Sequence, residues 1–262
     1  RSDLPYVVMC GCNIIFNIDL AEIIDAHERS GAHATMVYCR AEREHDDDVT
    51  ALEIGEAGRV RALHAGCSFG GNKFLDCCVI NRNVLLDIID NYQDVDHLDL
   101  FEAIEPEFGR IDVCSYEFKG LALGVFDEQS YYQRSMEMLR PDLNDRLFNP
   151  DRPIMTKAHD APPAKYCTGS TVCNSLVSAG CLIQGTVRGS ILARDVIVEH
   201  GASVSNSIIM QSCVIRSGAR VENAIVDKNN VIPAQTELRG TPDATLIIPK
   251  APLATKELAT LD

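Results

Sequence analysis

Two short polar runs are the first candidates for chemistry in this chain. Glu44 to Asp48 reads EHDDD and offers carboxylates and an imidazole that could hold a divalent cation. Consecutive carboxylates repel each other and point apart, so the run favours an exposed hairpin loop over a metal site. His200, in the string EHGAS, could act as the general base of an acyltransferase. A solvent-exposed histidine at a turn is the simpler interpretation.

Phosphate-binding and thiol motifs are also weak. A Gly-rich turn before a helix would cradle phosphate with backbone N–H groups, but Gly70-Gly71 indicates only a surface turn. The 11 cysteines are odd in number and form no CxxC pair. This pattern argues against a disulfide framework and against a zinc site. We expect buried free thiols in a reducing cytoplasm, and no metal or cofactor in this chain.

Composition excludes two classes of partner. The chain has 262 residues, 46% of them apolar, and no apolar run near 18 residues, so we expect no membrane span. Residues 1–150 carry 28 Asp and Glu against 13 Lys and Arg, whereas residues 151–262 carry 10 against 11. Because nucleic-acid surfaces need clustered positive charge, a nucleic-acid partner is excluded as well.

A repeat near the C-terminus predicts the element that dominates the architecture. Segments beginning at Thr186, Ser203, Arg220 and Glu237 are spaced 17 residues apart, and a shorter turn begins at Thr171. Aliphatic side chains recur within them at steps of five or six, the hexapeptide rhythm of a left-handed parallel β-helix with a triangular cross-section. The inward positions are predicted to be Val187, Leu192, Val198, Val204, Ile209, Ile215, Val221, Val226, Ile232 and Leu238.

The acidic half is typical of an α/β domain. Tyr6–Ile15 predicts one buried strand, and Asp19 is placed to cap a helix that ends before Gly31. A hairpin turn is expected at Glu56–Gly58, and Pro141–Pro163 is proline-rich and indicates a linker. The predicted domains are residues 1–140 (an incomplete α/β domain), 141–165 (the linker) and 166–262 (the β-helix).

Several strings resemble the sugar-nucleotide pyrophosphorylases, and within them the glucose-1-phosphate adenylyltransferase family. CNIIFNIDL from Cys12 is similar to the family's GDHIYKMDY, and RPIMTKAHDAPPAKY from Arg152 to its linker into the β-helix. FKG followed by SYYQRSMEML, and IVDKNNVIP and LIIPK, resemble further family segments. The resemblance implies an α/β plus all-β fold, with a partial Rossmann-like nucleotidyltransferase sheet before the β-helix. It also implies that the family's first βα unit lies upstream, so we expect an N-terminally incomplete chain.

The resemblance implies that the catalytic metal ligands are absent. Catalytic members hold a divalent metal with two Asp, and those positions correspond to Asn13 and Gly124 here. Asp127 is the nearest alternative to Gly124, but it is three residues away. We therefore expect no metal site in this chain and Mg²⁺ in a catalytic partner instead.

The sugar-phosphate pocket of the family is also altered. Its Ser-Met-Gly aligns with Phe74, Leu75 and Asp76, which add a bulky ring and a carboxylate where an anionic sugar phosphate would bind. Its Glu-Lys pair aligns with ALHAGC, in which His64 is the only polar side chain. The four degenerate positions Asn13, Gly124, Phe74 and Asp76 together predict that this site does not catalyse.

This combination resembles the GlgD-type regulatory subunits of the family. The resemblance implies a non-catalytic partner of a catalytic adenylyltransferase subunit, in a hetero- or homotetramer in the cytoplasm. It also implies an anionic small-molecule effector, held by Lys228, Lys250, Lys157 and His159. A catalytically active enzyme and an assembly subunit without effector binding remain the alternatives. A trimeric acyltransferase would have no need of the α/β half.

Overall fold

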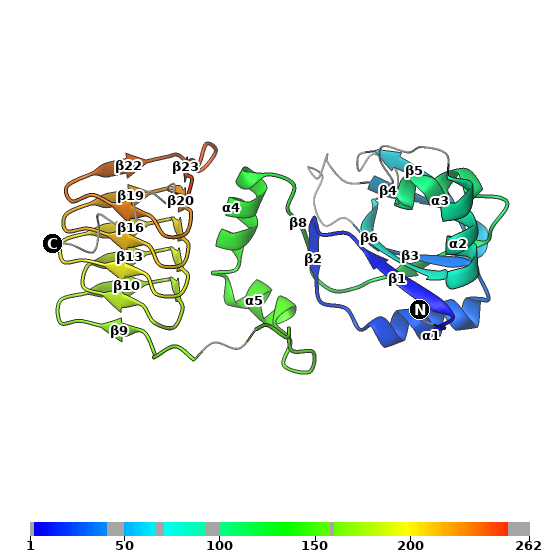
Figure 1. The fold of residues 1–262 in the computed structure, drawn as a ribbon, viewed down its shortest axis with the longest axis horizontal. Coiled ribbons are helices and arrows are strands. Elements are labelled where there is room, and N and C mark those ends of the chain that lie inside the picture. The colour runs from blue at the N-terminus through cyan, green and yellow to red at the C-terminus, as the bar shows by residue number, and fades with distance from the viewer. Residues whose placement is uncertain (1–2, 41–49, 66–70, 93–99, 158–159, 251–262) are drawn as a thin grey trace. The chain divides into compact units, whose positions relative to one another are not determined.

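The computed structural model describes residues 3–40, 50–65, 71–92, 100–157 and 160–250 (Figure 1). The chain forms two compact units. The first comprises residues 1–126 and 145–154, and the second comprises residues 127–144 and 155–262. These units, defined by contacts, interleave along the chain, whereas the sequence analysis placed consecutive domains; the boundaries at 140 and 165 stay a prediction. Among the residues with a described structure, no helix is long and apolar enough to cross a membrane.

A mixed sheet forms the centre of the first unit. Its strand order is β5-β4-β6-β3-β7, with β1 also paired to β6. The β3–β7 pair is parallel and the other pairs are antiparallel. One face packs against helices α2 (Arg82–Asn91) and α3 (Leu100–Ile104), and the other against helix α1 (Leu20–Ser30). The strands are β1 (Tyr6–Cys10), β3 (Ala34–Arg40), β4 (Thr50–Ile54), β5 (Val60–Ala65), β6 (Asn72–Asn81) and β7 (Val113–Glu117).

The helices of the first unit start and stop largely as the local sequence predicts. The Asp19 side chain accepts a hydrogen bond from the Ala21 N–H at 2.8 Å, and Gly31 ends α1 with a φ of 62°. The hairpin between β4 and β5 turns at Glu56–Gly58, as expected. The helices are α1 (Leu20–Ser30), α2 (Arg82–Asn91) and α3 (Leu100–Ile104), followed by a 3₁₀ turn at Glu105–Glu107.

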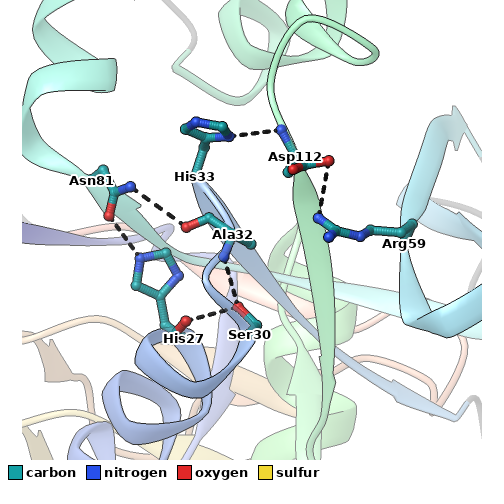
Figure 2. Close-up of polar contacts among 7 residues, drawn as sticks. All are labelled: His27, Ser30, Ala32, His33, Arg59, Asn81 and Asp112. Carbon is teal, nitrogen blue, oxygen red and sulfur yellow. Dashed lines mark hydrogen bonds and ion pairs between the residues drawn. The ribbon is translucent and has the colours of Figure 1, made fainter.

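A polar network fastens the end of α1 to the sheet (Figure 2). The ring of His27 is buried, with Nδ1 2.8 Å from Thr35 Oγ1 and Nε2 3.0 Å from Asn81 Oδ1. Because an amide oxygen only accepts, the ring donates through Nε2 and accepts the Thr35 hydroxyl at Nδ1. The Ser30 hydroxyl donates to the His27 carbonyl and accepts from the Ala32 N–H. The turn into β3 is therefore held by paired polar groups.

The single strand expected at Tyr6–Ile15 is wrong, because the chain breaks at Gly11. The Gly11 N–H donates to the Asp76 carbonyl at 2.7 Å, and a Cβ at Gly11 would lie 2.7 Å from Asp76 Cβ. Beyond this contact the chain leaves the sheet and forms β2 (Ile14–Phe16), which pairs with β8 (Ala122–Gly124). The break depends on a residue 65 positions away, so local hydropathy did not reveal it.

The segment predicted as a linker begins with a helix, α5 (Pro141–Leu147). Proline fits the first turn of a helix, and Leu143 and Leu147 are buried, so a weakly periodic stretch still folds. The following stretch is tied to the first unit by Asn17, whose Nδ2 donates to the carbonyls of Leu147 at 2.9 Å and Arg152 at 2.8 Å.

Three parallel sheets build the β-helix of the second unit, in which successive coils stack on one another (Figure 1). Thr171 pairs with Thr186, Thr186 with Ser203, Ser203 with Arg220, and Arg220 with Glu237, which confirms the predicted register. The strands are β9 (Lys165–Tyr166), β10 (Thr171–Cys173), β11 (Leu176–Val177), β12 (Leu182–Ile183), β13 (Thr186–Arg188), β14 (Ile191–Leu192), β15 (Ile197–Val198), β16 (Ser203–Ser205), β17 (Ile208–Ile209), β18 (Val214–Ile215), β19 (Arg220–Glu222), β20 (Ala224–Val226), β21 (Val231–Ile232), β22 (Glu237–Arg239) and β23 (Leu246–Ile248).

The predicted inward side chains fill the prism. Ile209, Ile215 and Val226 have no exposed surface, and Val221 is 1% exposed. Nine of the ten predicted positions are buried, and Leu238, in the last coil, is partly buried. Arg216 and Glu222, each one residue after an inward position, are half-exposed. Each forms an ion pair with a neighbouring coil, to Glu199 at 2.9 Å and to Arg239 at 3.1 Å respectively.

Helix α4 (Glu128–Glu137) covers the outer face of one β-helix sheet. Tyr132 is buried against Ile208 and Ile225, and its hydroxyl donates to the Asn206 carbonyl at 2.7 Å. Gln129 adds two hydrogen bonds to the last coil, donating to the Pro242 carbonyl and accepting from the Thr245 N–H. This helix follows β8 directly in sequence, yet its packing partners belong to the β-helix.

Candidate functional site

The pairing of β2 with β8 brings together Asn13 and Gly124, the two positions that correspond to the family's metal-binding Asp residues. Ile14 lies opposite Gly124, and the Val125 N–H donates to the Asn13 carbonyl at 2.7 Å. Asn13 is exposed and Gly124 is buried. Positions 13 and 124 are therefore neighbours in the fold, although 111 residues separate them in sequence.

The space beside Gly124 is already filled. A Cβ at this position would lie 2.5 Å from the Phe126 ring and 3.4 Å from Nζ of Lys73. Lys73 is 2% exposed and comes from β6. A carboxylate at position 124 would need the ring to move. No sequence argument singled out Lys73, although one lysine at the start of the apolar string NKFLDCCVI was a signal for it.

These residues do not fit a divalent metal. Mg²⁺ prefers anionic oxygen ligands in octahedral geometry. The two positions offer one neutral amide and no side chain, so they supply no anionic oxygen. Among the residues that the structure describes, no group of three or more His, Cys, Asp or Glu could hold a metal ion.

Asp127 does not replace the missing ligand. Its carboxylate accepts from the Ser130 N–H at 2.6 Å and caps α4, while the Ser130 hydroxyl oxygen accepts from the Asp127 N–H. The hydrogen bonds from Ser130 lower the pKa of this exposed carboxyl below its usual value. Asp127 is thus an N-cap residue whose role in the fold is explained without a metal.

The two altered sugar-phosphate positions have different surroundings. Phe74 is buried in the core and packs edge-on against Phe101, with ring centroids 5.0 Å apart. Asp76 lies in an irregular part of β6 with a φ of 48°, a conformation in which glycine is preferred. The family's glycine at the aligned position is consistent with this backbone. His64 lies 2.9 Å from Glu53 on the neighbouring strand.

The predicted effector residues fall in two places. Lys228 and Lys250 are exposed, and the segments that carry them lie together at one corner of the β-helix, because Asn230 Nδ2 donates to both the Asp227 carbonyl at 2.8 Å and the Pro249 carbonyl at 3.0 Å. Lys157 is exposed and precedes β9, the edge strand farthest from β21 in their shared sheet.

Other candidates have little support or fall outside the structure. His159, the Glu44–Asp48 run and Gly70 lie outside the described residues. His200 is exposed at a turn, where its carbonyl accepts the Ser217 hydroxyl at 2.7 Å. This position agrees with the simpler of the two interpretations given for it.

A thiol pair was missed by the sequence analysis. Cys10 on β1 lies opposite Cys77 on β6, with the two Sγ atoms 3.4 Å apart. The signal was two apolar strings far apart in the sequence, YVVMC and FLDCCV, each ending in or containing cysteine. Without the pairing of β1 with β6, nothing in those strings shows which thiols meet.

Comparisons with known proteins agree with the architecture. Residues 162–243 match the family model "GlmU-like, C-terminal hexapeptide", and hexapeptide repeats of this kind fit a left-handed β-helix. The chain is 33% identical over 95% of its length to "Glycogen biosynthesis protein GlgD" of Bacillus subtilis (strain 168), and 31% identical over 78% to the protein of that name from Geobacillus stearothermophilus. A glucose-1-phosphate adenylyltransferase of Corynebacterium jeikeium (strain K411) is 26% identical over 76% of the chain.

The matches cover only part of each relative. The aligned region spans 64% of the Bacillus protein, 50% of the Geobacillus protein and 56% of the Corynebacterium enzyme. Both halves of the chain take part in the longest match, so the likeness is not confined to the repeats.

Proposed function

The chain belongs to the family of the GlgD proteins and the glucose-1-phosphate adenylyltransferases, and on this basis we propose that it is a regulatory subunit of glycogen biosynthesis that does not itself transfer the nucleotidyl group. The reaction would be the formation of ADP-glucose and pyrophosphate from ATP and glucose 1-phosphate. A catalytic partner subunit would carry it out, with its own Mg²⁺.

One observation carries the proposal. Asn13 and Gly124 are adjacent across β2 and β8, and the Phe126 ring lies where a side chain at position 124 would extend. Nucleotidyl transfer needs a metal to neutralise charge developing on phosphate oxygens. A site that offers one neutral amide and no carboxylate at these two positions lacks the anionic ligands that would hold this metal.

The rest of the proposal concerns partners. A subunit without catalysis acts through an assembly, so we infer a mixed tetramer with the catalytic adenylyltransferase subunit in the cytoplasm. The corner that holds Lys228 and Lys250 supports an effector site for an anionic small molecule, since both lysines are exposed and Asn230 bonds to the residue before each of them. An effector bound at this corner would tune the partner's turnover through its different affinity for two states of the assembly.

The test compares the protein alone with the protein and its catalytic partner. ADP-glucose formation is assayed with ATP, glucose 1-phosphate and Mg²⁺. We expect no turnover from the protein alone, co-purification with the partner, and an altered effector response in the mixed assembly. Turnover by the protein alone at the level of a catalytic relative would refute the proposal.

A restored-ligand variant sharpens this test. The double substitution Asn13→Asp and Gly124→Asp puts back both carboxylates, and Asn13→Asp with Gly124→Ala is the matched control. We expect neither to gain activity, because the Phe126 ring still lies next to position 124 and the altered positions Phe74 and Asp76 remain. Mg²⁺-dependent turnover in the double Asp variant alone would mean that the metal site is intact apart from its ligands.

A further inference from the structure

The placement of Cys10 and Cys77 suits a disulfide bond. The two residues are direct cross-strand partners in the antiparallel β1–β6 pair. The Gly11 N–H donates to the Asp76 carbonyl, the pattern that flanks a non-hydrogen-bonded pair. Opposite Cα atoms in such a pair lie about 4.5 Å apart, and a disulfide accepts roughly 4.4–6.8 Å. A bond between the sulfurs would therefore need side-chain rotation and little backbone movement.

The two thiols are unequal. Cys10 is exposed, whereas Cys77 has no exposed surface. A hydrogen bond between them lowers the pKa of Cys10 to about 7, against the opposing effect of partial burial. The same hydrogen bond, followed by burial, raises the pKa of Cys77 well above its usual value. Cys10 is thus the accessible nucleophile, and Cys77 is the protonated thiol held beside it.

We propose that Cys10 and Cys77 form a thiol–disulfide site that small peroxides oxidise and thiols reduce. Neither the absent catalytic ligands nor the proposed regulatory function enters this inference, which rests on the placement of the two sulfurs. The neighbouring thiol of Cys78 takes no part, because it faces the opposite core cluster and burial raises its pKa to about 12.

The chemistry balances in two steps. The Cys10 thiolate attacks one oxygen of hydrogen peroxide, the O–O bond breaks, and hydroxide leaves and takes up the proton that Cys10 had released, giving water and a sulfenic acid. The Cys77 sulfur then attacks the Cys10 sulfur, the S–O bond breaks, and the Cys77 proton leaves with the hydroxyl as a second water. Two thiols lose two electrons in total, and one peroxide gains them.

The bond would have a local structural effect. It would tie the end of β1 to the irregular part of β6 around Asp76, where the Gly11 N–H already bonds. Asn13 follows only three residues after Cys10, so the turn into β2 would become part of a cross-linked loop. Oxidation would thus stiffen the segment that places position 13.

The experiment is peptide mapping after treatment of the protein with hydrogen peroxide. Remaining thiols are blocked with N-ethylmaleimide before digestion with trypsin. Cleavage at Arg and Lys yields one peptide from Ser2 to Arg29 and another from Phe74 to Arg82. We expect these two peptides to appear joined, with two hydrogen atoms lost, and to separate after dithiothreitol.

Each peptide carries a second cysteine, so variants assign the bond. The double variant Cys12→Ser and Cys78→Ser should still give the joined pair, and Cys10→Ser should abolish it. Cys173, another exposed thiol, is the internal control and should form no link to either peptide.

Three results would overturn the proposal. The first is loss of the joined peptides in the double variant. The second is oxidation of Cys10 to sulfinic acid while Cys77 can still be alkylated. The third is that Cys10 stays reduced while Cys173 is oxidised. Cys10 is exposed, so Cys10→Ala should fold if the serine variant does not, and it should likewise abolish the joined peptides.

Discussion

Replacing Ile215 with Ala gives the most direct test of how the β-helix is stabilised. Ile215 has no exposed surface and pairs in the sheet with Val198 on one side and Ile232 on the other. The substitution removes three buried carbons, worth about 2.4 kcal/mol at about 0.8 kcal/mol for each methylene. The cavity adds to this cost, because hydrogen bonds between stacked coils fix their spacing and prevent the coils from collapsing into the empty volume. We expect a loss of about 3–4 kcal/mol, within the range seen for buried Ile→Ala.

The neighbouring residue supplies the matched control. Val214 lies on the same strand but is only half-buried. Val214→Ala loses a similar β-branched preference and should cost roughly 1 kcal/mol or less. Urea unfolding followed by far-UV circular dichroism measures both, and hydrogen exchange of β-helix peptides assigns the transition to the second unit. An equal cost for the two variants would refute the burial argument, because it would show that the strand rather than the prism interior sets the stability.

Three further predictions follow from the contacts. The rate of alkylation of Cys10 by iodoacetamide should rise with pH, with a midpoint at about pH 7. Cys77→Ala should move that midpoint to higher pH, since the hydrogen bond that favours the thiolate is lost. An unchanged midpoint would argue against that bond. His27→Ala should lower the free energy of unfolding, measured by urea titration, by roughly 2–4 kcal/mol, because Thr35 and Asn81 lose their hydrogen bonds to the ring. A change under about 0.5 kcal/mol would contradict the role of the network. In the mixed assembly, Lys228→Ala should raise the concentration of the anionic effector needed for half-activation about fivefold or more without loss of basal turnover, whereas Lys119→Ala should leave both unchanged. Superimposable curves would remove Lys228 from the effector site.

The β-helix was predictable because each coil repeats a local pattern. Ile209, Ile215 and Val226 were identified as inward residues from spacing alone, since one coil's environment is nearly that of the next. The cap of α1 at Asp19 was predictable for a similar reason, because capping depends on residues two or three positions away.

Features that depend on distant partners were not predictable from a single sequence. The end of β1 at Gly11 is set by the carbonyl of Asp76, and the thiol pair by the register of β1 on β6. The proximity of positions 13 and 124 came from the family resemblance, and the crowding of position 124 by the Phe126 ring could come only from the structure. Helix α5 was missed because proline was taken as a breaker, although it sits at the first helical position.

The interleaving of the two units limits how the protein can be divided. The chain passes between units after residues 126, 144 and 154, so no single cut separates them. A cut after 126 would leave the first unit without the stretch that Asn17 holds by two carbonyls. A cut after 154 would take α4 from the β-helix and expose the isoleucines that Tyr132 covers. A recombination crossover at either point would therefore yield a chimaera in which one unit packs against a foreign segment. Exchange between relatives should keep both units from the same parent.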